Sequence, residues 1–350
     1  MKVGTQARDV VLRAMRFEQT ETCPYYIWVD ADMVDALDEI YGRDRFLGPA
    51  GGTHTFDGSY TAMMDLHALP ISEEGEYFED EYGTKLRRGS ILHLEAPALA
   101  GPSLAGYTFP DLATDVHLAG LDSWAQTHAA RFRIFQLGML FWERTWFMRG
   151  MEEIMVDFHE HPGFVEELLD GLAEVCLRVI DRLLGEHGDR IDAIGFSEDY
   201  GTETSMLMSP ETWRHFIKPR LARMCERIKQ GGKYVYLHSC GHVRPIIGDL
   251  VEVGVDILQP IQPEAMDIFE IKRTFGRELC LMGGISTQQT LPDGTPEQVQ
   301  REVAACLEHM AAGGGYIMAP AKPIMACVPM TNARALIDAF LAQDGGVWQE

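Results

Sequence analysis

The chain contains no long apolar run and no apolar segment near its start. A membrane-spanning helix needs roughly 20 consecutive apolar residues, and no stretch of the sequence reaches that length. The first residues carry charges throughout, without the apolar core of a secretory signal. We therefore expect a soluble, cytoplasmic protein that has no membrane partner.

Cysteines are also few and irregularly placed. Seven of them are scattered over 350 residues, an odd number without a repeating spacing. Disulfide-stapled domains are usually short and carry an even number of closely spaced cysteines. The pattern predicts reduced thiols. The 46% of hydrophobic residues are then enough to form a core without disulfides.

Positive charge is the third scarce feature. The chain has 30 lysines and arginines against 53 aspartates and glutamates, which gives a formal net charge of −23. Such a surface repels the phosphate backbone of nucleic acids. We expect small molecules rather than nucleic acid as partners.

What the sequence does contain is an alternation of two patterns from about residue 132 onward. Short β-branched or aromatic runs are followed by longer stretches of helical periodicity. The runs predict strands at residues 132–138, 192–198, 233–240, 256–262, 279–285 and 314–321, and residues 24–30 predict another. Strictly alternating strands and helices indicate a parallel sheet that is covered by helices.

Two of the intervening helices have clear start and stop signals. Ser209 and Thr295 each precede a proline and a glutamate, the order expected at a capped helix start. Glycines follow at 231–232 and at 313–315. The sequence therefore predicts one helix from 210 to 230 and another that begins at 296.

The fold class predicted is α/β, with two architectures to compare. An open doubly wound sheet gathers its chemistry at one switch point, whereas a (β/α)8 TIM barrel gathers it at the C-terminal ends of all strands. Polar residues follow six successive strands here, which favours the barrel. We expect residues 1–350 to form a single barrel domain. Residues 45–125, rich in Gly, Pro and acidic clusters, are expected to form a cap insertion over its mouth.

The most informative motif is His238-Ser-Cys240-Gly241-His242, at the end of a predicted strand. Side chains two apart on a strand point to the same side, so His238 and Cys240 can bind one ion. Gly241 allows a sharp turn that keeps them near an open rim. The alternative is that both are packed core residues, because two ligands alone do not make a site.

Other strand ends supply further candidates. Glu198 or Asp199 can provide a metal carboxylate or a general acid, or can instead cap a helix or pair with Arg220. The candidates for catalysis are Asp199, Tyr200, His242 and Lys322, and those for binding substrate or cofactor are Trp28, Asp30, Gln262, Gly283 and Gly284.

Taken together, these motifs resemble the uroporphyrinogen decarboxylase-like superfamily, and within it the corrinoid and thiol methyltransferases. The resemblance covers essentially the whole chain. It is carried by His238-Ser-Cys240-Gly, by residues 249–260, by Gly283-Gly284-Ile285, by residues 313–320 and by residues 328–332. Residues 102–106 and 146–150 also look like a subgroup of that superfamily. The resemblance implies a barrel enzyme, and it marks the superfamily more specifically than the reaction.

The decarboxylase branch of the superfamily acts on a tetrapyrrole without a cofactor. Its members carry an arginine-rich N-terminal segment that holds the substrate's carboxylates. At that place this chain has Tyr25-Tyr26-Ile27-Trp28-Val29-Asp30. A polyanionic substrate would meet an aspartate there, which speaks against decarboxylation of uroporphyrinogen.

The methyltransferase branch binds zinc through a His-x-Cys pair and a later cysteine that follows the last strand. The pair matches at His238 and Cys240, whereas Lys322 occupies the place of the later cysteine. Either Cys327, about a turn further on, or Glu198 would have to complete the metal site. The metal ligands that the resemblance implies are thus His238, Cys240, Cys327 and Glu198.

The hypothesis is a methyltransferase that moves a methyl group between a corrinoid and a small thiol or methylated substrate, with zinc as a candidate cofactor. A corrinoid protein is a candidate partner. One alternative is a decarboxylase or lyase without cofactor, in which Asp30, Tyr200 or Asp199 places protons. The cationic anchors of that alternative would be Arg144, Arg149, Arg244 and Lys322. A second alternative is a non-catalytic corrinoid or tetrapyrrole binder. Lys322 is expected to face the mouth, close to His238 and Cys240.

Overall fold

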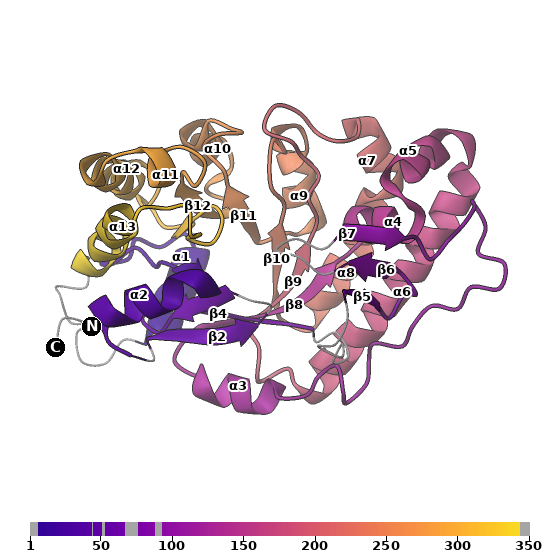
Figure 1. Ribbon diagram of the computed structural model, residues 1–350, viewed down its shortest axis with the longest axis horizontal. Coiled ribbons are helices and arrows are strands. Elements are labelled where there is room, and N and C mark those ends of the chain that lie inside the picture. The colour runs from indigo at the N-terminus through magenta and orange to yellow at the C-terminus, as the bar shows by residue number, and fades with distance from the viewer. Residues whose placement is uncertain (1–5, 44, 51–52, 67–75, 88–92, 344–350) are drawn as a thin grey trace.

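The computed structural model describes residues 6–43, 45–50, 53–66, 76–87 and 93–343, and a curved parallel sheet forms its centre (Figure 1). The sheet has seven strands in the order β13-β12-β11-β10-β9-β8-β4, and all neighbours run parallel. Its strands are β4 (Thr61–Asp65), β8 (Phe132–Met139), β9 (Ala193–Ser197), β10 (Tyr234–His238), β11 (Ile257–Ile261), β12 (Cys280–Ile285) and β13 (Tyr316–Pro320). The expected α/β class and the six predicted strands from residue 132 onward are confirmed.

The segment around Tyr25 lies between the two ends of this sheet. Tyr25 forms a parallel bridge with Met318 of β13, and the amide of Tyr26 donates to the Met318 carbonyl at 2.9 Å. On its other side, the Tyr25 carbonyl accepts from the amide of Tyr60, next to β4, at 2.9 Å. The sheet is therefore curled so far that both edges contact the same segment, an arrangement consistent with a barrel.

Two small antiparallel sheets lie outside the parallel one. One has the order β1-β3-β2 and the other β5-β6-β7. Their strands are β1 (Trp28–Asp30), β2 (Phe46–Ala50), β3 (Thr53–Phe56), β5 (Tyr77–Glu79), β6 (Lys85–Arg87) and β7 (His93–Ala96). The predicted strand at 24–30 is thus divided between Tyr25, which contacts the main sheet, and β1.

The range expected to form the cap, 45–125, contains more than hairpins and loops. Strand β4 lies within that range and belongs to the parallel sheet, where it pairs with β8. Strand β4 was not predicted because its sequence, TAMMD, contains alanine and methionine, which favour helices more than strands. The remaining hairpins of the range are separate from the main sheet. Residues 51–52, 67–75 and 88–92 of the expected cap lie outside the described residues.

Helices surround the curved sheet (Figure 1). They are α1 (Ala7–Met15), α2 (Ala31–Tyr41), α3 (Leu121–Thr127), α4 (Trp142–Arg149), α5 (Met151–Glu160), α6 (Pro162–Glu186), α7 (Pro210–Phe216), α8 (Lys218–Gln230), η1 (Arg244–Ile246), α9 (Ile247–Val253), α10 (Ile268–Phe275), α11 (Thr290–Asp293), α12 (Pro296–His309) and α13 (Met330–Ala342). None of the helices in the described ranges is both long and apolar enough to span a membrane.

The two helices with predicted start signals behave differently. Thr295 and Gln298 form a reciprocal capping box at the start of α12, as expected. The helix predicted from 210 to 230 is instead two helices, because Pro219 has no amide hydrogen to continue the ladder of α7. Ser209 still caps α7, and its side chain accepts from the amide of Thr212.

The register of the parallel strands determines which polar residues meet. His238, the last residue of β10, is paired with Ser197 of β9 and with Gln259 of β11. The carboxyl ends of these strands therefore lie at one edge of the sheet. Asp199 follows β9 and Cys240 follows β10 at this edge, so residues 41 positions apart become neighbours.

Candidate functional site

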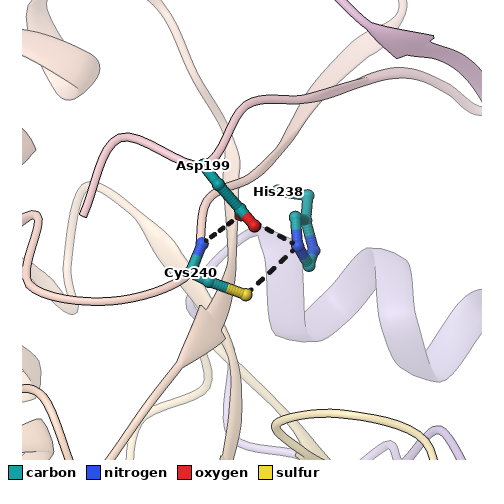
Figure 2. A group of neighbouring side chains, drawn as sticks. All are labelled: Asp199, His238 and Cys240. Carbon is teal, nitrogen blue, oxygen red and sulfur yellow. Dashed lines mark hydrogen bonds and ion pairs between the residues drawn. The ribbon is translucent and has the colours of Figure 1, made fainter. Parts of the chain in front are cut away.

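Three side chains that can bind metal come together beyond β9 and β10: Asp199, His238 and Cys240 (Figure 2). Their ligand atoms all lie within 4.8 Å of one another. The Nε2 atom of His238 is 3.3 Å from the Sγ atom of Cys240 and 3.4 Å from the Oδ1 atom of Asp199. We refer to these three residues as the ligand group.

The ring of His238 is held in a defined orientation by a neighbouring strand. Its Nδ1 atom is 2.5 Å from the Oε1 atom of Gln259, which also accepts from the hydroxyl of Tyr236 at 2.7 Å. An amide oxygen only accepts, so Nδ1 carries a proton and donates it. Nε2 is left to face Cys240 and Asp199, which is the arrangement of a metal-binding histidine with a second partner behind it.

Asp199 is held by the loop that follows β10. Its Oδ1 atom accepts from the backbone amide of Cys240 at 2.9 Å. Burial alone would raise the pKa of Asp199, but His238, Lys322 and this amide outweigh it and lower the pKa below the usual value. Asp199 is therefore an ionised carboxylate at neutral pH.

Gly241 allows the loop to make its turn. Its φ of +80° lies in the left-handed region, which side chains other than glycine rarely adopt. A Cβ atom at this position would lie 2.4 Å from the backbone of Gly201. The close approach of these two loops brings Cys240 beside Asp199.

The ligand group fits a soft divalent metal ion such as zinc. With Zn–N and Zn–O bonds of about 2.1 Å and a Zn–S bond of about 2.3 Å, tetrahedral ligands lie about 3.4 to 3.6 Å apart. The observed separations from Nε2, 3.3 Å to Sγ and 3.4 Å to Oδ1, are close to these values. A nitrogen, a sulfur and a carboxylate oxygen also form a donor set that zinc accepts, with a fourth position open.

Two further charged side chains surround the ligand group. Burial raises the pKa of Glu143, and the charge of Asp199 raises it further, whereas Ser197 donates to its Oε2 atom at 3.0 Å. Burial would lower the pKa of Lys322, but the charges of Cys240, Asp199 and Glu143 raise it overall. Lys322 thus lies near the ligand group, as the sequence predicted. Glu143 was not predicted, because nothing in the sequence shows that α4 starts beside the end of β9.

A cavity of about 570 Å³ opens beside the ligand group, and His238 and Ser197 form part of its wall. Strand β8 contributes Gln136, and β4 contributes Met63 and Asp65. Its aromatic lining consists of Tyr26, Trp28, Trp124 and Tyr236. A volume of this size suits a small organic molecule.

Two of the predicted metal ligands do not join the ligand group. Cys327 is exposed and is not among the described side chains that come together with His238 and Cys240. Glu198 is fully buried, and its carboxylate accepts from the backbone amides of Phe141, Trp142 and Glu143 at the start of α4. The carboxylate that reaches the pair is instead the next residue along the chain, Asp199.

Tyr200 and His242 lie away from the ligand atoms. The side chain of Tyr200 is fully buried and packs edge-on against Trp213, with ring centroids 5.8 Å apart. The Nδ1 atom of His242 bonds to the carbonyl of Ala265 at 2.9 Å, and its ring lines a separate surface groove beside α7. The proposed alternative of an ion pair with Arg220 is also wrong for Glu198 and Asp199, because Arg220 pairs with Asp170 at 2.7 Å.

Among the predicted binding residues, only Trp28 lines the cavity. Gln262 is buried, and its Oε1 atom accepts from the amide of Gly241 at 3.1 Å, so it supports the loop of the ligand group. Gly283 and Gly284 lie in the buried strand β12, where Cβ atoms would collide with Ile261 and the hydroxyl of Tyr316. Asp30 is half-buried at the start of α2 and is not part of the cavity wall.

Fold and site together define an α/β protein in which parallel strand ends gather a His, Cys and Asp ligand group beside a cavity. The family model described as Uroporphyrinogen decarboxylase (URO-D) matches residues 145–342, more than half of the chain. The chain therefore belongs to the uroporphyrinogen decarboxylase (URO-D) family. The matched segment contains the whole ligand group.

Curated relatives include two methyltransferases. The methylcobamide:CoM methyltransferase MtaA of Methanosarcina barkeri is 32% identical over 133 residues, 38% of this chain and 37% of the relative. The methylated-thiol–coenzyme M methyltransferase of Methanosarcina mazei is 25% identical over 136 residues, 39% of this chain and 34% of the relative. The matched part of the chain thus spans well under half of the length of each of these relatives.

A solved structure resembles the chain over nearly its full length. It is a methyltransferase from Methanosarcina mazei, which is 17% identical and superposes with a TM-score of 0.71 over 98% of this chain and 99% of that one. At this identity the likeness shows the fold alone. The two proteins share one overall architecture.

Proposed function

We propose that this protein is a methyltransferase that moves a methyl group between a corrinoid and a small thiol or methylated substrate. The observation that carries the proposal is the ligand group, in which Nε2 of His238 lies 3.3 Å from Sγ of Cys240 and 3.4 Å from Oδ1 of Asp199. The relatives that act on methylcobamide and on methylated thiols support the same chemistry.

In this proposal, zinc is bound by His238, Cys240 and Asp199. The chemistry that zinc supplies at such a site is to lower the pKa of a bound thiol, which is then present as thiolate at neutral pH. Gln259 keeps the His238 lone pair directed at the ion, and the amide of Cys240 fixes Asp199. Positioning of this kind contributes to catalysis because the reacting groups no longer have to be brought together from solution.

We also propose that the sheet is a (β/α)8 TIM barrel, within one domain, and that hairpins of the range 45–125 form a cap over its mouth. Gly48 of β2 and Thr55 of β3 support this, because both line the cavity together with His238. A cover at this position would keep water from a thiolate or a reduced corrinoid.

The arginines required by the decarboxylase alternative are already engaged. Arg144 pairs with Asp80 at 2.6 Å, Arg149 with Asp157 at 2.9 Å and Arg244 with Glu270 at 2.9 Å. Within the described part of the chain, no lysine or arginine lines the cavity. Lys322, the fourth expected anchor, lies near the ligand group. A polycarboxylated ring would thus meet one of the four expected cations to compensate for its lost hydration, which favours methyl transfer.

The proposal is tested by anaerobic incubation of the zinc-loaded protein with methylcobalamin and CoM, followed by visible spectroscopy. We expect loss of the methylcobalamin spectrum and formation of methylated CoM in equal amounts. Cys240→Ser should abolish both changes. If zinc-loaded wild-type protein left methylcobalamin intact with CoM and with other small thiols, the proposed reaction would be wrong.

A further inference from the structure

The wall of the cavity is rich in aromatic side chains. Tyr26, Trp28 and Trp124 present aromatic rings there, and Met63 adds a polarizable thioether. The ring centroids of Tyr26 and Trp28 lie 5.9 Å apart, with an angle of 36° between the ring planes, so the two rings are neighbours in the wall. Aromatic faces carry partial negative charge and attract cations that have lost part of their water.

The charged groups of the wall favour a cation as well. Asp65, the last residue of β4, is the carboxylate in the lining, and no lysine or arginine of the described residues lines the cavity. Burial raises the pKa of Tyr26 to about 12, and the charge of Asp65 contributes to the increase.

The two histidines of the wall do not reverse this balance. Burial, together with Arg131, lowers the pKa of His128 to about 4, so its ring is uncharged at neutral pH. His238 faces the carboxylate of Asp199 at 3.4 Å and belongs to the ligand group. Among the described residues of the wall, His238 is then the side chain that can carry positive charge, and the carboxylate of Asp199 lies beside it to offset that charge.

We propose that this cavity binds a methylated onium cation, a quaternary ammonium or tertiary sulfonium compound, between Trp28, Tyr26 and Asp65. The identification of this cation as the methyl-bearing substrate rests on the proposed function, whereas the binding site itself does not. An onium group is large and weakly hydrated, so its transfer out of water costs little free energy. Contacts with aromatic faces and with one carboxylate then stabilise it in the cavity.

The positions of these residues in the chain add a further point. Tyr26, Trp28, Asp65 and Trp124 all precede residue 145, where the match to the family model begins. The ligand group lies inside the matched segment. The onium site is thus built from the part of the chain that the family model does not describe. Residues in this part can determine a substrate preference that differs from that of other family members.

The test compares the binding of choline with that of 3,3-dimethylbutan-1-ol, a neutral molecule of the same shape. Both affinities are measured by isothermal titration calorimetry of the whole protein at about 0.15 M salt. At this salt concentration, the diffuse attraction of cations to the acidic surface is largely screened. We expect choline to bind about tenfold more tightly than the alcohol. Trp28→Leu, which keeps apolar bulk, and Asp65→Asn should each weaken choline binding about fivefold or more and leave the binding of the alcohol nearly unchanged.

Exposed residues provide matched controls. Tyr77→Ala removes an exposed aromatic ring, and Asp115→Asn removes an exposed carboxylate, so neither should change choline binding. Equal affinity for choline and the alcohol, no binding of choline, tetramethylammonium or trimethylsulfonium, or undiminished choline binding in both cavity variants would each overturn the inference. Because binding is measured without methyl transfer, failure of the enzymatic reaction with intact choline binding would count against the proposed function alone.

Discussion

At the scale of single residues, the sequence identified His238 and Cys240, and it offered either Glu198 or Asp199 as a metal carboxylate but chose Glu198 for the ligand set. The spacing of His238 and Cys240 is local, and the period of a strand is enough to place both side chains on one side. The contribution of Asp199 depends on the register between β9 and β10, which brings it beside a loop about 40 residues later. Asp199 and Glu198 are adjacent carboxylates, and only the fold shows which of them is buried under α4.

Substitution of Asp199 tests the revised ligand set. We expect Asp199→Ala to lower the zinc content of the purified protein strongly, because the ion would lose one of three protein ligands. Cys327→Ser is the matched control and should retain the full zinc content, since Cys327 is exposed and apart from the ligand group. Elemental analysis measures both. Zinc retained in Asp199→Ala but lost in Cys327→Ser would restore the ligand set implied by the sequence resemblance.

Gln259 is the partner that orients the His238 ring, and its contribution can be measured separately. We expect Gln259→Leu to weaken zinc binding about 10- to 100-fold, because the imidazole loses the acceptor for its Nδ1 hydrogen. Competition with a chelator of known affinity measures the change. The same substitution at the exposed Gln230 is the control, and an unchanged affinity in Gln259→Leu would mean that the ring needs no such support.

At the scale of elements, strands were predicted well and the segment before residue 132 was not. Buried strands such as β10 and β12 consist of continuous apolar runs, a pattern that predicts a buried strand from the sequence. Strand β4 carries no such signal, and it is a strand because β8 offers it a partner. The break between α7 and α8 has a cause that is visible in the sequence, because Pro219 disfavours a continuous helix through the residue before it.

A buried ion-pair cluster ties α1 to the sheet, and it predicts how stability depends on pH. Asp192 accepts hydrogen bonds from Arg8 of α1 at 2.7 Å and from Arg133 of β8 at 3.2 Å. Burial would raise the pKa of Asp192, but these bonds outweigh it and lower the pKa below its usual 3.8. The unfolded chain binds this proton more readily, so the contribution is fully present above about pH 4 and is lost as the pH falls through the lower, folded-state pKa.

We therefore expect the free energy of unfolding to fall between pH 4 and more acidic conditions, and Asp192→Asn to reduce this fall. Urea denaturation of the wild type and the variant at pH 7 and at pH 3 measures the difference between them. Asp122→Asn, at an exposed ion pair, is the control with little expected effect. Identical pH dependence in Asp192→Asn and the wild type would show that the cluster does not contribute.

At the scale of the whole molecule, the ligand group and much of the cavity wall come from different parts of the chain. The ligand group lies within residues 145–342, which match the family model, whereas much of the cavity wall comes from earlier residues. The sequence predicted the superfamily and the place of the chemistry from its strand ends. It predicted Trp28 as a binding residue but not the rest of the cavity wall, because Asp65 and Trp124 are brought beside Trp28 only by the curvature of the sheet and the position of α3.

The central claim is that Asp199, His238 and Cys240 hold a zinc ion that accepts the thiol substrate. X-ray absorption spectroscopy at the zinc edge counts sulfur ligands and tests this claim most directly. The account predicts one sulfur ligand, from Cys240, in the protein alone, and two sulfur ligands when CoM is present. Two sulfur ligands without thiol, no change on addition of thiol, or no zinc in protein prepared without chelators would contradict it.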